Sequence, residues 1–183
     1  LGDNILNSGV TELVESFQAG DYGAGIALQE VENPGAFGIA DVDDNDNVTQ
    51  LIEKPDDPPT NLALIGMYVF SSAVFKQIND LEPSWRGELE ITDAIQDLLE
   101  QGDAIDVHVV TGWWKDTGKP EDILEANRLV LEDTALETEG TIEEGAETHG
   151  SIELAESATI EDGATVRGPA SIAEHTTIGS GAY

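Results

Sequence analysis

The chain has 183 residues, of which 38 are acidic and 7 are basic, so its formal net charge is −31 at pH 7. This charge disfavours nucleic acids and anionic membranes as partners. The absence of cysteine excludes disulfides, thiolate nucleophiles and zinc–cysteine sites.

An acidic surface over a packed core is the form of the molecule that we expect. Hydrophobic residues make up 39% of the chain and fall in periodic runs, which argues against disorder. The acidic excess favours a halophilic source, because concentrated salt screens the repulsion between like charges. No apolar stretch is long enough to cross a bilayer and no signal peptide opens the sequence, so we expect a cytoplasmic protein.

The sequence opens on Leu1-Gly2-Asp3-Asn4, without a methionine, and resembles the middle of a domain. An apolar residue before Gly-Asp-Asn suits the carboxyl end of a buried strand, where α/β proteins hold their ligands. A plain turn fits these residues equally well.

Helical and strand patterns alternate through the next part of the chain. In chain order we predict a helix at 10–17 that Gly20 closes, then strands at 25–31, 36–42, 48–52 and 62–70, helices at 71–79 and 89–99, a strand at 105–110 and a helix at 120–131. The acidic loop 43–47 lacks the glycine and the distant glutamate of an EF-hand, so we predict a hairpin turn there rather than a calcium site. The alternation predicts an α/β fold with a wound, mostly parallel sheet.

After an acidic connection over 132–139, an apolar residue returns about every six positions. The series is Ile142, Leu154, Ile160, Val166, Ile172 and Ile178, broken only by Thr148. A period of six fits neither a helix nor an ordinary strand and is typical of the hexapeptide repeats of a parallel β-helix. We therefore predict two domains, at residues 1–135 and 136–183.

The few cations are concentrated in segments rich in Pro, Gly and Trp, at Lys54, Arg86, Lys115 and Lys119. Such residues suit an anionic ligand, phosphate above all, although local salt bridges to the abundant acids explain them as well. Asp3 and Asp116 offer carboxylate oxygens at two predicted strand ends. Magnesium bound to phosphates commonly uses one or two such carboxylates.

Several short motifs, in this order and spacing, resemble those of the sugar-1-phosphate nucleotidyltransferases, particularly the long form of glucose-1-phosphate thymidylyltransferase with a β-helix tail. The motifs are Gly2-Asp3-Asn4, Pro34-Gly35-Ala36-Phe37-Gly38, Glu53-Lys54-Pro55, Asn61, Gly66-Met67-Tyr68, Pro83-Ser84-Trp85-Arg86-Gly87-Glu88-Leu89-Glu90-Ile91-Thr92-Asp93 and Trp114-Lys115-Asp116-Thr117-Gly118. The resemblance covers nearly the whole chain.

The resemblance implies that a sugar 1-phosphate attacks the α-phosphorus of a nucleoside triphosphate and displaces pyrophosphate, with no covalent enzyme intermediate. It implies a nucleotidyltransferase-type sheet followed by a left-handed parallel β-helix. Carried over by motif, Asp3 and Asp116 would bind Mg²⁺, Lys54 and Arg86 the sugar phosphate, and Glu53 the sugar hydroxyls. The sugar-side wall would be Asn4, Gly38 and Tyr68, with Trp114 either on the sugar face or in the core. Lys54, Arg86 and Asp116 are the expected catalytic residues.

One part of the family pattern is missing from this sequence. The glycine-rich loop with a basic residue, which in the family precedes Gly-Asp-Asn and cradles the triphosphate, is absent. We therefore expect the carboxyl-terminal part of an enzyme, with little or no transferase activity by itself.

Three alternatives stay open at this point. The substrates could be UTP in place of dTTP, or an amino-sugar phosphate in a bifunctional enzyme. The repeats, with His149 and His175, could hold an acyltransferase, although we interpret them as an assembly or regulatory platform of a homo-oligomer. A non-catalytic sugar-phosphate sensor is the alternative from a different class.

Overall fold

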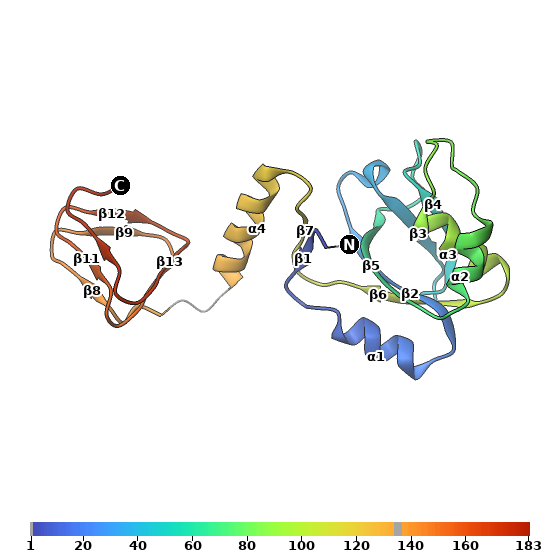
Figure 1. Cartoon of the computed structure of the whole chain (residues 1–183), viewed down its shortest axis with the longest axis horizontal. Helices are drawn as coiled ribbons and strands as arrows, with labels where there is room; N and C mark the ends of the chain where they lie inside the picture. The colour runs from blue at the N-terminus through green and yellow to red at the C-terminus, as the bar shows by residue number, and fades with distance from the viewer. Residues whose placement is uncertain (1, 134–136) are drawn as a thin grey trace. The chain divides into compact units, whose positions relative to one another are not determined.

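The computed structural model describes residues 2–133 and 137–183 (Figure 1). The chain divides into two compact units, Leu1–Asp116 and Thr117–Tyr183. The predicted boundary between residues 135 and 136 lies outside the described residues, as does the strand predicted to end before Asp3. Within the described residues, no helix combines the length and the apolar character needed to cross a membrane.

A five-stranded mixed sheet in the order β4-β3-β5-β2-β6 forms the first unit. Its strands are β2 (Tyr22–Glu30), β3 (Gly38–Val42), β4 (Val48–Glu53), β5 (Leu62–Phe70) and β6 (Ala104–Val109). Only the β2–β6 pair is parallel, whereas β2–β5, β3–β4 and β3–β5 are antiparallel. The prediction of a mostly parallel sheet is therefore wrong, because short connections such as 43–47 can join only antiparallel neighbours.

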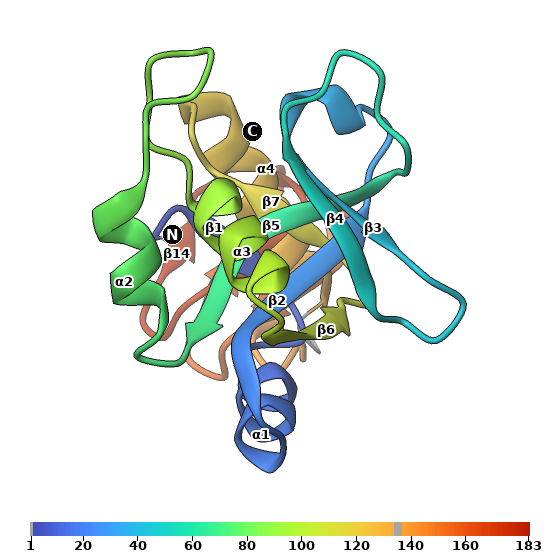
Figure 2. The same cartoon turned by 90° about the vertical axis from the view of Figure 1, so that its right-hand side faces the viewer.

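The strand β2 is buried on both of its faces. Ala24, Ile26 and Leu28 belong to one apolar cluster, together with Ile95 and Leu98 of helix α3 (Ile91–Glu100). The alternate residue Ala27 packs in a second cluster with Leu13 of helix α1 (Thr11–Ala19). Helices thus cover both faces of the sheet, which explains the continuous apolar run of this strand. Figure 2 shows α3 across one face of the strands.

Two further short elements of this unit are the 3-10 turn η1 (Pro34–Ala36) and the helix α2 (Val74–Asp80). The predicted helices and strands are confirmed as elements, with ends that differ by a few residues. In the hairpin loop, Asp43 Oδ1 accepts hydrogen bonds from the backbone N–H groups of Asn45 and Asn47 at 2.8 and 2.9 Å. Hydrogen bonds from Asn47 and Asn45 hold the pKa of Asp43 below its usual value. The predicted hairpin turn is confirmed.

Two short strands, β1 (Asn4–Leu6) and β7 (Trp114–Asp116), pair antiparallel outside the main sheet. Their register places Asn4 opposite Asp116 and Leu6 opposite Trp114. This pairing brings together two of the motifs that are farthest apart in the first unit.

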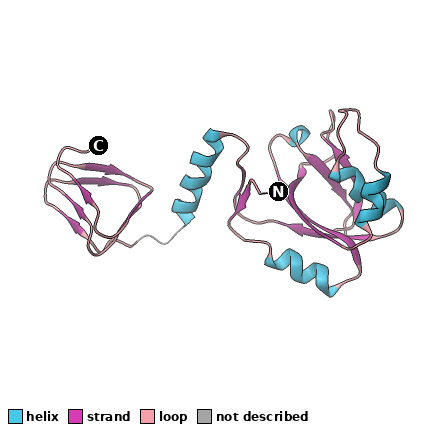
Figure 3. Cartoon of the chain, viewed as in Figure 1, coloured by secondary structure: helices cyan, strands magenta, loops and turns pink. Residues whose placement is uncertain are grey.

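The second unit begins with helix α4 (Pro120–Asp133) and continues in three small parallel sheets (Figure 3). Their strand sets are β8 (Thr141–Ile142), β11 (Thr159–Ile160) and β14 (Thr177–Ile178); β9 (Glu147–His149) and β12 (Thr165–Arg167); and β10 (Ile152–Leu154) and β13 (Ala170–Ile172).

Each strand of these sheets pairs with the strand eighteen residues away, as in the series Thr141, Thr159 and Thr177. Eighteen residues are three hexapeptides, so the predicted repeat is confirmed as a repeat of parallel strands. Leu154, Ala158, Ile160 and Ala164 have no exposed surface and form the interior. The position that breaks the apolar series, Thr148, is exposed.

Candidate active site

A cavity of about 240 Å³ opens in the first unit beside the β1–β7 pair and the end of β4. Seven of the nine site residues predicted from the sequence line it: Asn4, Gly38, Glu53, Lys54, Tyr68, Trp114 and Asp116. Asp3 and Arg86 do not line this cavity, but both contact residues that do.

At the end of β4, the carboxylate of Glu53 is held in one orientation. Thr92, which is 2% exposed, donates a hydrogen bond from Oγ1 to Glu53 Oε2 at 2.7 Å. The other oxygen, Oε1, lies 3.6 Å from Lys54 Nζ and 3.5 Å from Arg86 Nη1. One carboxylate thus joins the two cations that the sequence singled out.

Gly38 leaves the space in which this carboxylate sits. A Cβ added at Gly38 would lie 2.8 Å from Thr92 Oγ1 and 3.0 Å from Glu53 Oε2, the two atoms of the hydrogen bond. Such distances are too short for real Cβ contacts, so either the residue or the bond would have to shift. The absence of a side chain here is a steric requirement of the site.

Lys54 adopts a left-handed backbone conformation, with φ of 41°. A non-glycine residue rarely takes this conformation, which costs on the order of 1 kcal/mol or more and persists only where the surrounding structure imposes it. The Lys54 N–H donates to the carbonyl of Phe37 at 3.1 Å, which fixes the turn. In this conformation the ammonium group lies beside Glu53, and Lys54 lines the cavity.

The four cations that the sequence grouped together are not all at this cavity. Arg86 pairs with three carboxylates, so salt bridging, the other explanation for these cations, also applies to it. Lys115 lies in β7, and Lys119 belongs to the second unit.

Asn4 and Trp114 form another part of the cavity lining. Trp114 Nε1 donates to Asn4 Oδ1 at 2.7 Å, and Asn4 Nδ2 donates to Asp3 Oδ1 at 3.0 Å. The Trp114 ring also meets Phe37 edge-on, with ring centroids 5.5 Å apart, and packs against the apolar cluster of α1. The indole therefore packs against the core and also lines the cavity.

Two carboxylates, Asp3 and Asp116, come from the facing ends of β1 and β7. Because Asn4 pairs with Asp116, the preceding residue, Asp3, follows the backbone to the same end of the pair. Among residues 2–133 and 137–183, no group of three or more His, Asp or Glu side chains could hold a metal ion by itself. The pair fits a magnesium ion that takes its other ligands from substrate oxygens and water.

Burial, reinforced by the nearby charge of Glu53, raises the pKa of Tyr68 to about 12. The phenol on the cavity wall is therefore neutral at physiological pH and keeps its proton for donation to a ligand oxygen.

Two further residues of the site, Glu90 and Thr92, received no role in the sequence analysis. Both line the cavity, and both are buried. Both lie in the motif from Arg86 to Asp93. Within it, Glu90 could have been predicted as a partner of Arg86, since the two are four residues apart and form an ion pair. The hydrogen bond from Thr92 to Glu53 joins α3 to β4, and no local sequence pattern predicts a contact between such distant residues.

In the second unit, His149 lies 3.6 Å from Glu147 through Nε2 and is half exposed. The backbone N–H of His175, whose φ is 61°, donates to Ser157 Oγ at 3.0 Å. These are the contacts made by the two histidines of the acyltransferase alternative.

Residues 1–133 match the family model described as nucleotidyl transferase. The low-salt glycan biosynthesis nucleotidyltransferase Agl11 of Haloferax volcanii is 77% identical over 158 residues, which cover 86% of this chain and 44% of that protein. A glucose-1-phosphate thymidylyltransferase of Streptomyces antibioticus is 45% identical over 159 residues, with 86% and 45% covered.

A solved structure gives the same result for the fold. A candidate glucose-1-phosphate thymidylyltransferase from Bacillus anthracis, in complex with a sucrose, aligns with a TM-score of 0.63 and 36% identity, over 75% of this chain and 55% of that one. The chain spans less than half the length of the two curated relatives it matches here.

Proposed function

This chain belongs to the nucleotidyl transferase family, and we propose that it forms the sugar-phosphate side of an enzyme that couples a nucleoside triphosphate to a sugar 1-phosphate. The products are a nucleotide-sugar and pyrophosphate. The observation that carries the proposal is the β1–β7 pairing, which sets Asp3 and Asp116 beside a cavity that Glu53 and Lys54 also line.

The proposed substrates are glucose 1-phosphate and dTTP, in the synthesis of nucleotide-sugars for glycans. The likeness to a thymidylyltransferase and to a glycan-biosynthesis nucleotidyltransferase supports this choice. UTP, or an amino-sugar phosphate in a bifunctional enzyme, is the alternative within the same reaction.

The residues predicted for the sugar side of the site each have a proposed role in binding. Lys54 and Arg86 offset the charge of the sugar phosphate as it approaches a second, anionic phosphate. Glu53, oriented by Thr92, accepts hydrogen bonds from sugar hydroxyls, and Tyr68 donates to the sugar. Asn4, Gly38 and Trp114 form the wall against which the ring lies.

Asp3 and Asp116 would hold Mg²⁺, which when bound neutralises charge on the phosphate oxygens. The reaction needs no protein nucleophile, because the sugar phosphate itself attacks the α-phosphorus in line. Catalysis in this proposal consists of positioning and charge neutralisation.

For the second unit we propose a left-handed parallel β-helix of three hexapeptides per coil, within a domain of residues 136–183 that follows a nucleotidyltransferase domain of residues 1–135. The offset of eighteen residues between paired strands supports it. Its proposed role is assembly into a homo-oligomer, since coils stacked in this way present a flat end for contact.

The experiment for the reaction is pyrophosphate release by a protein in which this chain is extended to the length of its relatives. We expect release that requires Mg²⁺ and glucose 1-phosphate together, and that is faster with dTTP than with UTP. Binding of glucose 1-phosphate without any release of pyrophosphate would favour the non-catalytic sensor instead.

Replacement of Gly38 by alanine tests the sugar side of the site. The new methyl group would collide with the Thr92–Glu53 hydrogen bond, and overpacking of this kind costs about 1–3 kcal/mol. Because a displaced Glu53 no longer meets the sugar hydroxyls, we expect the dissociation constant for glucose 1-phosphate to rise about tenfold or more in calorimetry. The control is Gly179→Ala, because a Cβ at Gly179 meets nothing closer than 3.8 Å. Equal affinities of the two variants would contradict the proposed position of the sugar.

A further inference from the structure

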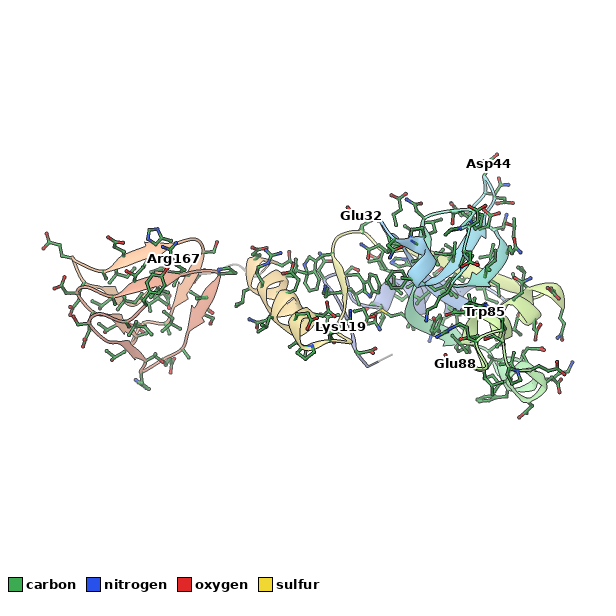
Figure 4. All side chains as sticks on the ribbon, turned by 90° about the horizontal axis from the view of Figure 1, so that it is seen from above. Glu32, Asp44, Trp85, Glu88, Lys119 and Arg167 are labelled. Atoms are coloured by element: carbon green, nitrogen blue, oxygen red, sulfur yellow. The ribbon has the colours of Figure 1, made fainter. Side chains whose placement is uncertain are left out.

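Arg86 carries three ion pairs that differ in their exposure to solvent. Its Nη1 lies 3.0 Å from Glu90 Oε1 and 3.5 Å from Glu53 Oε1, while its Nη2 lies 3.1 Å from Glu88 Oε2. The side chain of Glu88 is 62% exposed, whereas those of Glu90 and Glu53 are 10% and 15% exposed. Figure 4 labels Glu88 and the exposed Trp85, the two residues that flank the arginine and its adjoining Gly87.

The loop that carries Arg86 is closed on itself through Ser84. The Ser84 hydroxyl donates to Glu90 Oε1 at 2.9 Å and accepts the backbone N–H of Arg86 at 3.1 Å. The Ser84 N–H donates to the Glu88 carbonyl, and the Gly87 N–H donates to the Ser84 carbonyl, each at 2.8 Å. Gly87 makes the turn with φ of 77°.

These contacts converge on one oxygen atom. Glu90 Oε1 accepts both from the Arg86 guanidinium and from the hydroxyl that holds the Arg86 backbone. The carboxylate thereby fixes the two ends of a long side chain that would otherwise sample many rotamers. It also competes with Glu53 for Nη1, the nitrogen that both carboxylates approach.

We propose that Glu90 is a positioning residue for Arg86: it aims the guanidinium at the sugar phosphate and keeps it from closing onto Glu53. This inference rests on the proposed function, in which Arg86 binds the phosphate and Glu53 binds the sugar hydroxyls. Glu88 touches the same guanidinium from solvent and does not share this role.

Because Glu90 is negatively charged, the direction in which its replacement changes phosphate binding distinguishes two roles. Removing a negative charge beside a cation would by itself strengthen the binding of a phosphate anion. If Glu90 instead positions Arg86, its loss weakens binding, because an arginine freed from a buried partner no longer meets the phosphate in a fixed geometry.

The test is calorimetric titration of the 183-residue chain with glucose 1-phosphate at one fixed, high potassium chloride concentration. For Glu90→Gln we expect the dissociation constant to rise about tenfold or more, as for removal of one partner of a buried ion pair. For Glu88→Gln, which removes an equal charge from the same guanidinium, we expect a change of less than about threefold. Binding by Glu90→Gln that equals or exceeds that of the unsubstituted chain would overturn the inference.

A second measurement separates positioning from a general loss of structure. In an Arg86→Ala background, Glu90→Gln should not raise the dissociation constant, because Glu90 then has no guanidinium to position and only a negative charge is removed. A loss that persists in this background would contradict a role through Arg86. Should Glu90→Gln fail to fold, Ser84→Ala removes the hydroxyl that fixes Glu90, and we expect it to weaken binding about threefold; unchanged binding by that variant would count against the inference.

The inference and the proposed function fail in different ways. No binding of glucose 1-phosphate by the unsubstituted chain would contradict the proposed function and this inference with it. Binding by the unsubstituted chain that Glu90→Gln does not weaken contradicts the inference alone.

Discussion

Replacement of Asp116 by asparagine is expected to lower the turnover of the extended enzyme by about 10³-fold or more, with little change in sugar-phosphate affinity. Asp116 lines the cavity and pairs with Asn4, the residue that follows Asp3. An asparagine keeps the shape of the side chain but loses the negative charge that holds a divalent cation. In the proposed site Lys54 and Arg86 bind the sugar phosphate, and both remain in this variant, so we expect its affinity to be kept.

Turnover should be measured as pyrophosphate release, and affinity as calorimetric binding of glucose 1-phosphate, for which we expect a change of less than about threefold. The matched control is Asp44→Asn, which makes the same change of charge in the exposed β3–β4 hairpin. Figure 4 labels Asp44. If Asp116→Asn retained turnover within about tenfold of the original, its assignment to the metal would be wrong.

Replacement of Ile160 by alanine is expected to lower the free energy of unfolding of the second unit by about 3 kcal/mol. Ile160 has no exposed surface, and its strand β11 pairs with β8 on one side and β14 on the other. Truncation therefore leaves a cavity in the middle of the stack. Ile142, its paired equivalent eighteen residues earlier, is 40% exposed, so Ile142→Ala should cost about 1 kcal/mol or less.

Urea unfolding followed by circular dichroism measures this difference, and tryptophan fluorescence supplies an internal reference. All three tryptophans, Trp85, Trp113 and Trp114, belong to the first unit, so their transition should not shift in either variant. Equal destabilisation by the two replacements would show that these positions are not inner and outer sites of one stack.

Local sequence patterns were sufficient for the helices, the strands and the repeat. The strand at Leu62–Phe70 occupies the predicted range, because a short apolar run bounded by polar turns suits a buried strand better than a helix. The hexapeptide period likewise predicted the parallel strands of the second unit, since equivalent residues recur at paired positions eighteen residues apart. The hairpin at Asp43 was predictable for a local reason too, as its side chain bonds to its own loop.

Strand direction was decided only in the tertiary structure, and the prediction of a mostly parallel sheet failed there. The direction of a strand depends on which distant strand becomes its neighbour: β2 lies between β5 and β6, both far along the chain. Periodicity within a strand carries no record of that choice.

The site divides in the same way. The sequence pointed to Lys54 and Arg86 because basic residues are few in this chain, and to Asp3, Glu53 and Asp116 through the motifs that contain them. Only the folded chain sets Asn4 opposite Asp116 and closes Thr92 onto Glu53. It also gives Glu90 its two partners. A charge is a property of one residue, whereas its orientation depends on side chains from other strands and helices, which only the packing of the core brings within hydrogen-bonding distance.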